Sequence, residues 1–356
     1  MTKFEIFNNK QNSYHLKDFY FDLPEKLIAK YPPKKRGDAK LMVLDREKQT
    51  VEHHKFSDIT NFLEPKDCLV LNDTKVFPAR LFATKDQTDA KVEVFLLRQL
   101  DDNIWETIVK PARKVRVGNK LVFTDKIHCD IIDNTVSSGR VIRHNCSKEE
   151  FMEYIMEHGK SPIPPYIKRE SEPIDKIRYQ TVFAENIGAV AAPTAGMHFT
   201  EKILNKIEKN KVTKASLTLH IGLGTFKPIT VEDISRHNMH SEYYDISKDT
   251  VEKVNNTMKN GGNIVAVGTS VVRALESAYI SDMQITKQNS WTDKFIYPPY
   301  KFKIVDKIIT NFHQPKSSLI ILVSAFANRD FIFKAYKEAI KKKYNFYSYG
   351  DAMLII

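Results

Sequence analysis

Three clusters of reactive polar residues lie between residues 189 and 242, and each follows an apolar run. They are AVAAPTAGMHFT (189–200), LTLHIGLGTFKPI (217–229) and HNMHSE (237–242). A buried hydroxyl, imidazole or carboxylate costs free energy unless it finds a partner. Because folds tolerate such groups at strand ends mainly where a site needs them, we interpret the three clusters as one functional site.

The first cluster has residues that can handle protons. It places Thr194 and His198 around a proline and a glycine, directly after an apolar run. In open α/β sheets, ligands bind beyond the carboxyl ends of the strands, which is where we expect this loop. A histidine there can act as a general base or donate a hydrogen bond to a substrate. A structural histidine is the alternative, and the neighbouring clusters favour the functional interpretation.

The segment VAVGTSVVRALES (265–277) places Gly268, Thr269 and Ser270 between an apolar strand and a helix. A helix N-terminus attracts anions, so this turn is a candidate for holding a carboxylate or a phosphate. Simple capping of the helix by Thr269 or Ser270 is the alternative. The chain has neither a GxGxxG nor a Walker sequence, so no motif supports a Rossmann nucleotide fold.

A metal site is a weaker interpretation of the third cluster. His237, His240 and Glu242 could contribute ligands, and His198 or His220 could complete the set. Their spacing matches no zinc signature such as HExxH. We therefore expect acid–base and recognition roles for these residues, without a metal.

Two further segments carry charge near apolar or aromatic residues. LNDTKVFPAR (71–80) offers Asp73, which a turn would also favour, and Arg80, which needs an acidic or phosphate partner. KKKYNFYSYGD (341–351) alternates lysines with aromatic residues. Such rings can stack on RNA bases while lysines contact phosphates, and packing of the rings in the core is the alternative.

The composition agrees with a globular protein that binds a polyanion. The net charge of +11 and pI near 9.2 would attract RNA, although a general bias towards lysine also explains part of the excess. Three cysteines without CxxC spacing indicate neither disulfides nor a zinc knuckle. The longest apolar run, 319–327, is shorter than the ~20 residues that cross a bilayer, and we expect a cytoplasmic protein.

The pattern of apolar residues predicts two architectures in one chain. Residues 40–45 and 50–56 form a hairpin, and residues 21–32 a short helix. From 68 to 143, short β-patterned runs without a helix predict a small barrel.

A helix at 148–158 and a proline-containing linker at 161–167 follow the barrel segment. After them, strand-like runs alternate with helical ones, which predicts a largely parallel sheet. These pairs of runs are 187–194 with 199–210, 261–270 with 271–280, and 317–327 with 331–343.

The predicted fold class is therefore α/β, with a three-layer α/β main domain and an inserted small antiparallel β-barrel domain. The main domain is discontinuous and comprises residues 1–70 and 148–356, with the barrel at 71–147.

Several blocks of the chain closely resemble one enzyme family, the S-adenosylmethionine:tRNA ribosyltransferase-isomerases of queuosine biosynthesis. The resemblance runs from about Phe19 to the C-terminus. It rests on the three clusters and on LVLNDTKVFPARL (69–81), VGTSVVRALES (267–277), TNFHQPKSSLIILVSAFA (310–327) and YSYGDAMLI (347–355). Pro299 stands where the family usually has glycine, and the residues before Leu16 are atypical.

The resemblance implies transfer and isomerisation of the ribosyl part of S-adenosylmethionine onto 7-aminomethyl-7-deazaguanine at the tRNA wobble position, giving epoxyqueuosine, adenine and methionine. S-adenosylmethionine is then a substrate, and no cofactor is expected. The implied chemistry removes a C5′ hydrogen beside the sulfonium, expels adenine and joins the vinyl sulfonium to the aminomethyl group. We expect a monomer that binds S-adenosylmethionine and tRNA and no membrane.

The role hypotheses follow from that chemistry. His198 and Glu242 are the acid–base candidates, and His240 and His220 would orient groups or relay protons. The turn from Gly268 to Ser270 with Arg273 would receive the methionine carboxylate or a phosphate. The other candidates for substrate binding are Asp73, Arg80, Thr194, Asn311, His313 and Asp351. An ordinary methyltransferase and a non-catalytic RNA-binding protein are the alternative functions.

Overall fold

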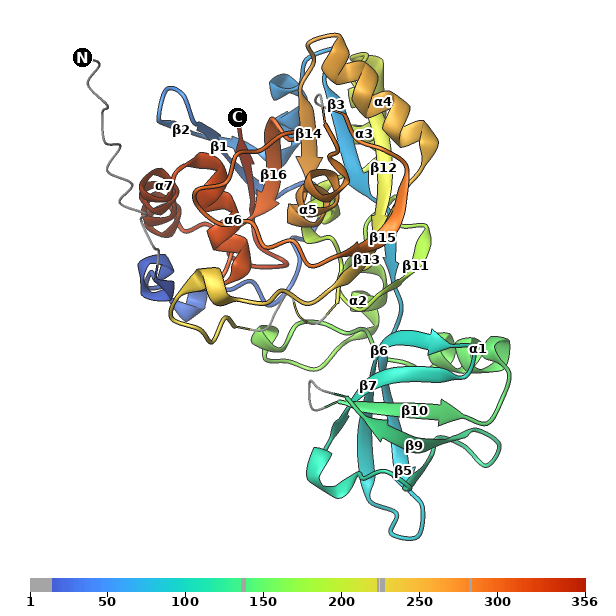
Figure 1. The fold of residues 1–356 in the computed structure, drawn as a ribbon. Helices are drawn as coiled ribbons and strands as arrows, with labels where there is room; N and C mark the ends of the chain where they lie inside the picture. Colours follow the sequence, from blue (N-terminus) through green and yellow to red (C-terminus); the bar gives the residue numbers. More distant parts are fainter. Residues whose placement is uncertain (1–14, 136–138, 223, 225–227, 282–283) are drawn as a thin grey trace, which may run out of the picture.

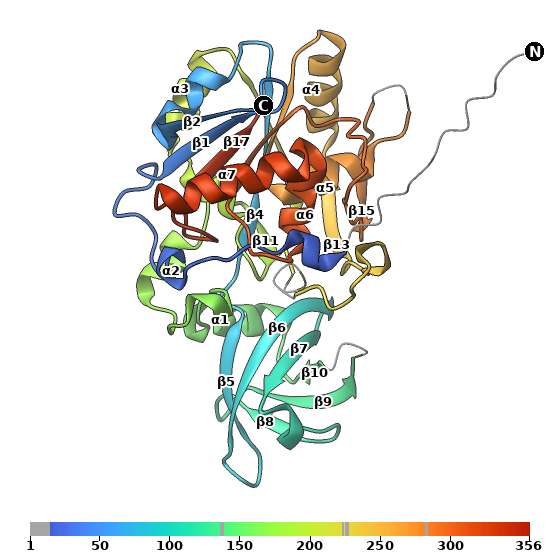
Figure 2. The same ribbon diagram turned by 90° about the vertical axis from the view of Figure 1, so that its left-hand side faces the viewer.

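The computed structural model describes residues 15–135, 139–222, 224, 228–281 and 284–356. These residues form a main body around a nine-stranded sheet and a closed six-stranded barrel (Figures 1 and 2). All the paired strands of the barrel are antiparallel. The predicted combination of an α/β domain with an antiparallel barrel is confirmed.

The nine-stranded sheet has the order β15-β13-β12-β3-β14-β16-β17-β1-β2. Strands β12, β3, β14 and β16 are parallel to one another, whereas β13, β15, β17 and β2 each pair antiparallel with a neighbour. The sheet is thus mixed, and the prediction of a largely parallel sheet holds only for its four central strands and for β17 with β1, which are also parallel. The bounds are β1 Lys40–Asp45, β2 Thr50–Lys55, β3 Cys68–Asn72, β12 Thr213–Leu219, β13 Glu242–Ile246, β14 Ile264–Val267, β15 Gln288–Thr292, β16 Lys307–Asn311 and β17 Ala352–Ile355.

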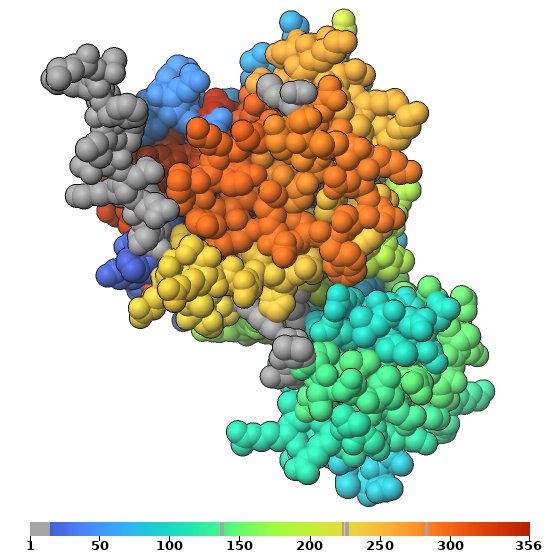
Figure 3. All heavy atoms as spheres, in the orientation of Figure 1, coloured from blue at the N-terminus to red at the C-terminus, as the bar shows by residue number. Residues whose placement is uncertain are grey.

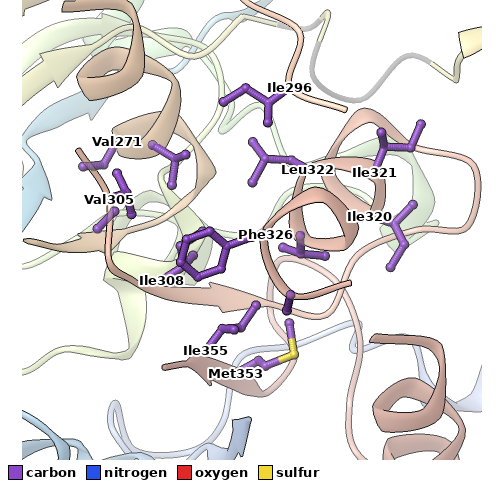
Figure 4. Packing of buried hydrophobic residues seen from close by; sticks show 14 of the residues in the cluster. Val271, Ile296, Val305, Ile308, Ile320, Ile321, Leu322, Phe326, Met353 and Ile355 are labelled. Carbon is purple, nitrogen blue, oxygen red and sulfur yellow. The ribbon is translucent and has the colours of Figure 1, made fainter. Parts of the chain in front are cut away.

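Helices cover both faces of this sheet and give it three layers. Side chains alternate between the faces of a strand, so Val70 of β3 joins one core while Leu69 and Leu71 join the other. The first core lies under α4 (Lys248–Lys259), α5 (Thr269–Ala278), α6 (Ser318–Ala327) and α7 (Arg329–Lys341), and the second under η3 (Phe56–Phe62) and α3 (Glu201–Lys209). Figure 4 shows Phe326 of α6 beside Ile308 of β16 in the first core.

Two local predictions were wrong. The apolar run from Ser317 was expected to be a strand, but it is helix α6, which begins where the Ser317 side chain accepts a hydrogen bond from the amide of Ile320. A short run buried on nearly all sides has no periodicity that separates helix from strand. Residues 21–32 were expected to form a helix, but only one 3₁₀ turn, Glu25–Leu27, forms after Pro24.

The barrel strands all lie within the predicted segment 71–147, and its treatment as a separate domain stays a prediction. The run LVLN at 69–72 was assigned to the barrel but belongs to central strand β3. Figure 3 shows the barrel projecting from the main body. Its strands are β5 Arg80–Lys85, β6 Lys91–Asp101, β7 Ile104–Lys110, β8 Lys120–Val122, β9 His128–Asn134 and β10 Arg140–His144.

Short elements connect the two parts. Strand β4 (Thr74–Val76) leaves the sheet and pairs with β11 (Asn186–Ala189), so the run at 187–194 is not a strand of the large sheet. Helix α1 (Lys148–His158) forms as predicted and packs on the barrel, and α2 (Pro173–Arg178) follows. Among the described residues, every helix is too short or too polar to cross a membrane.

Candidate active site

One edge of the sheet collects most of the predicted site residues. The parallel strands β12, β3, β14 and β16 end at this edge, while β13 and β17 begin there because they run in the opposite direction. Ligands bind beyond the carboxyl ends of parallel strands in such sheets. The residues that the strand ends bring to this edge are Asn72, His220, Glu242, Gly268, Asn311 and Asp351.

A pocket of about 80 Å³ lies at this edge, and we call it the inner pocket. It is lined by predicted candidates from the ends of β13, β14 and β16. Met239 of the third cluster and Tyr347 and Ser348 of the segment 341–351 also line it, as does Tyr166, which was not predicted. The predicted residues in its wall are Thr194, Glu242, Gly268, Thr269, Ser270, Arg273, Asn311 and His313.

The start of helix α5 forms one wall of the inner pocket. Gly268 has a φ of 94°, a conformation that glycine adopts without strain, and its amide donates to Ile309 O at 2.8 Å. No side chain caps α5, so the capping alternative for Thr269 and Ser270 was wrong. The Ser270 hydroxyl instead accepts a hydrogen bond from the Asn72 amide at 3.1 Å. An uncapped helix N-terminus in a pocket wall suits an anionic group.

Glu242 and Arg273 form a buried ion pair in the wall of the same pocket. Their side chains are 4% and 6% exposed. The other Glu242 oxygen, Oε1, accepts the Gly222 N–H at 2.9 Å. Arg273 also donates to the carbonyl oxygens of Thr292 at 3.1 Å and Lys294 at 2.9 Å. Each nitrogen of the Arg273 guanidinium thus already has a protein acceptor. This geometry favours a role in orienting Glu242 over the predicted contact with the methionine carboxylate or a phosphate.

His198 lies behind the pocket wall. Its Nε2 accepts a hydrogen bond from the Asn311 side-chain amide at 3.1 Å, and Asn311 Oδ1 accepts from the Thr194 hydroxyl at 2.9 Å. Burial, together with the nearby charge of Arg36, lowers the pKa of His198 to about 4. His198 is therefore neutral at pH 7, and the nitrogen that would take a proton is occupied. The geometry favours a residue that positions Asn311 over the predicted acid–base role.

This burial has a measurable consequence for stability. The folded pKa of His198 lies below the ordinary value of 6.5, so the unfolded chain binds the proton first. The free energy of unfolding should fall as pH decreases from about 6.5 towards 4. His198→Gln keeps an acceptor for Asn311 but does not titrate, so its stability should fall less over the same range in urea unfolding curves. Burial also lowers the pKa of His313 to about 3, and this contribution is the same in the wild type and in His198→Gln. If the free energy of unfolding fell equally with pH in the two proteins, the assignment to His198 would be contradicted.

His313 and Asp351 differ in their relation to the inner pocket. His313 lines it, and its Nε2 is hydrogen-bonded to the Thr310 hydroxyl at 2.9 Å. Asp351 is not in the wall. Its two oxygens accept the backbone N–H groups of Lys40 and Asn345, each at 2.7 Å, and burial raises its pKa. Asp351 therefore joins the C-terminal turn to β1, and its predicted place in the wall was wrong.

A second, larger cavity of about 1070 Å³ lies between the sheet and the barrel, and we call it the outer cleft. The inner pocket and the outer cleft share Ile221 and Glu242. The main body contributes His220, His240, Tyr243 and Trp291 to the wall of the outer cleft. The barrel contributes Arg98 and Trp105.

The two histidines of the outer cleft have different surroundings. His220 Nδ1 is hydrogen-bonded to the Thr74 hydroxyl at 2.8 Å, and burial lowers its pKa. A Cβ at Gly188 would lie 2.5 Å from the His220 ring, so only glycine allows this close approach. His240 is exposed. Both histidines are placed for the predicted relay of protons near Glu242, and that role stays a prediction.

Asp73 and Arg80 lie outside both cavities. Asp73 Oδ1 accepts hydrogen bonds from the Thr218 hydroxyl at 2.6 Å and from the Asn186 amide at 3.1 Å. Arg80 Nη1 lies 3.6 Å from Glu93 Oε1 within the barrel, which gives Arg80 the acidic partner that the sequence required. These contacts favour structural roles over the predicted binding of substrate.

The metal site, the aromatic segment 341–351 and Pro299 are the remaining points raised by the sequence. Among the residues that the structure describes, no three His, Cys, Asp or Glu side chains are close enough to hold a metal ion. Tyr344, Phe346 and Tyr349 are at most 3% exposed, so these rings pack in the core and cannot stack on RNA. The Pro298–Pro299 peptide bond is cis.

Comparison with known proteins identifies the family. The model of a family described as "Queuosine biosynthesis protein" matches residues 16–355. The chain belongs to this family. A protein of Sulfurihydrogenibium sp. (strain YO3AOP1) is 51% identical over 341 residues, which cover 96% of this chain and 99% of that protein. A protein of Chloroherpeton thalassium is 52% identical over 343 residues, with the same shares covered. Both are named S-adenosylmethionine:tRNA ribosyltransferase-isomerase.

A solved structure is also similar to this chain. It is the crystal structure of an S-adenosylmethionine tRNA ribosyltransferase from Thermotoga maritima, which is 35% identical with a TM-score of 0.54. The match covers 95% of this chain and all of the other. The family resemblance inferred from the sequence motifs is thus confirmed.

Proposed function

We propose that this chain transfers and isomerises the ribosyl part of S-adenosylmethionine onto 7-aminomethyl-7-deazaguanine at the tRNA wobble position, producing epoxyqueuosine-tRNA, adenine and methionine. The observation that carries the proposal is identity of about half of all residues, over nearly the whole length, to proteins named for this activity. The geometry agrees with it, because a reaction between two substrates needs two adjoining sites, and the two cavities meet at Glu242.

The inner pocket suits the S-adenosylmethionine side of the reaction. The uncapped start of α5 would hold the methionine carboxylate. Asn311, fixed by His198 and Thr194, would contact the ribose or adenine through its polar side chain. Closure of this pocket by the bound tRNA would also protect a reactive vinyl sulfonium from water.

Glu242 is the group that we assign to proton transfer at the boundary of the two cavities. Its carboxylate is fixed by Arg273 and by the Gly222 amide, which sets the direction of its oxygens. A positioned carboxylate can remove the C5′ hydrogen that the sulfonium acidifies. His220 and His240, in the outer cleft, would then exchange protons with the attacking amine.

The proposal includes three further properties. S-adenosylmethionine is consumed as a substrate, and no metal or other cofactor takes part. The protein works as a monomer in the cytoplasm. Its net charge of +11 supports attraction to tRNA through counterion release.

The test is incubation of the purified protein with S-adenosylmethionine and tRNA bearing the precursor base, followed by mass analysis of nucleosides and small molecules. We expect epoxyqueuosine, adenine and methionine in equal amounts, and none when the tRNA lacks the precursor. Formation of S-adenosylhomocysteine would instead identify a methyltransferase. Binding of tRNA without any product would indicate a non-catalytic RNA-binding protein.

A further inference from the structure

An aromatic side chain stands exposed where the outer cleft opens. Trp291, on edge strand β15, is 51% exposed although a large ring on an edge strand favours unwanted association. It lies opposite Tyr243 of β13 in the strand register, with ring centroids 5.7 Å apart. Tyr243 in turn stacks on His220, with centroids 5.8 Å apart and ring planes at 22°. Three rings thus line the cleft from its mouth inward.

Cations from the barrel and from helix α1 line the same cleft. The guanidinium of Arg98 lies 5.4 Å from the centre of the Trp291 ring and donates from Nε to Glu106 at 2.7 Å. Lys148, at the start of α1, also lines the cleft, and its side chain is 46% exposed. Rings flanked by cations form the arrangement that binds single-stranded nucleic acid, because bases stack on the rings while cations attract the phosphates.

The alternation along β13 connects this wall to the reacting groups. Glu242 and Tyr243 are neighbours in β13, so their side chains point to opposite faces. Glu242 pairs with Arg273 of α5, and Tyr243 lines the outer cleft together with residues of the barrel. Glu242 lines both cavities, because it is the first residue of the strand and lies where they meet. A base in the cleft can therefore present a substituent to Glu242.

We propose that the outer cleft receives the wobble base, turned out of the anticodon loop, with Trp291 as its stacking platform and with Tyr243 and His220 as the wall that leads it to Glu242. This inference rests on the proposed function and adds the site and residues for the nucleobase. Enzymes that modify a base take it out of its stack and hold it between aromatic or apolar side chains. The aminomethyl group would then enter the boundary between the cavities, where the ribosyl group arrives from the inner pocket.

The test compares two anticodon stem-loop RNAs, one with 7-aminomethyl-7-deazaguanine at the wobble position and one with an abasic site there. Stacking of one base contributes about 1–3 kcal/mol, so the wild-type protein should prefer the first RNA by about five- to 150-fold. Trp291→Ala should bind both RNAs equally, while Trp291→Phe should keep most of the preference. The affinity of Trp291→Ala for S-adenosylmethionine alone should stay at the wild-type value.

Tyr20→Ala is the matched control, because Tyr20 is 55% exposed and Lys316 Nζ lies 5.1 Å from its ring centre, outside both cavities. It should keep the full preference. If the wild type releases adenine and prefers the RNA with the base, but Trp291→Ala keeps this preference, the inference is overturned and the proposed function stands. Wild-type protein that releases adenine but binds both RNAs equally would also overturn it. Wild-type protein with no adenine release would overturn the proposed function, and the inference with it.

Discussion

Glu242→Gln is expected to lower kcat by about 10²- to 10⁴-fold, the usual contribution of a positioned acid–base group. Glutamine has the same shape and can still accept the Gly222 N–H, but it cannot take a proton. The affinity for S-adenosylmethionine should change much less than kcat. The measurement is the rate of adenine release with saturating precursor RNA, together with binding of S-adenosylmethionine by calorimetry.

Glu93→Gln provides the control for this substitution. Glu93 also faces an arginine, Arg80, and its side chain is 19% exposed, but it lies in the barrel outside both cavities. We expect wild-type kcat from this variant. Equal rates for Glu242→Gln and the wild type would show that Glu242 takes no part in proton transfer, and His220 and His240 would become the candidates.

Arg273→Met is expected to lower the free energy of unfolding by about 3–5 kcal/mol, because it leaves the Glu242 carboxylate buried without its cation. The Gly222 amide would remain as a partner of Glu242, but one hydrogen bond offsets only part of the cost. The double variant Arg273→Met/Glu242→Gln should recover part of the loss, since it removes the buried charge. Denaturant unfolding of the four proteins measures the coupling.

Lys253→Met serves as the comparison for the ion pair. Lys253 and Asp249 lie on helix α4, outside both cavities, with Nζ and Oδ2 2.7 Å apart and side chains 40% and 69% exposed. Removal of such an exposed pair should cost about 0.2–1 kcal/mol. A loss as small as this for Arg273→Met would contradict the account of the buried pair.

The position of some candidates could be predicted where strand ends determine it. Gly268 follows the apolar strand β14 and Asn311 ends the apolar strand β16, so the expectation that they meet at one edge follows from the rule for ligands in α/β sheets. The barrel was also predictable, because residues of β5 and β7 alternate with the period of a strand. The N-terminal hairpin was predictable because its two runs flank a polar turn.

The roles of individual side chains could not be predicted, because they depend on contacts between distant segments. His198 and Asn311 are 113 residues apart, and only the folded chain shows that the amide occupies the imidazole nitrogen. Asp351 holds the Lys40 amide, a contact across 311 residues. Trp291 was missed because a single tryptophan in a polar segment has no pattern, and its exposure at a cavity emerges only in three dimensions.

The most direct test of the central claim is incorporation of solvent deuterium at the carbon derived from C5′ during turnover in heavy water. Mass analysis of the product nucleoside and of recovered S-adenosylmethionine would compare the wild type, Glu242→Gln and His198→Gln. We expect deuterium at that carbon for the wild type and for His198→Gln, and none above background for Glu242→Gln. Incorporation by Glu242→Gln at the wild-type rate would contradict the claim that Glu242, at the boundary of the two cavities, moves the proton.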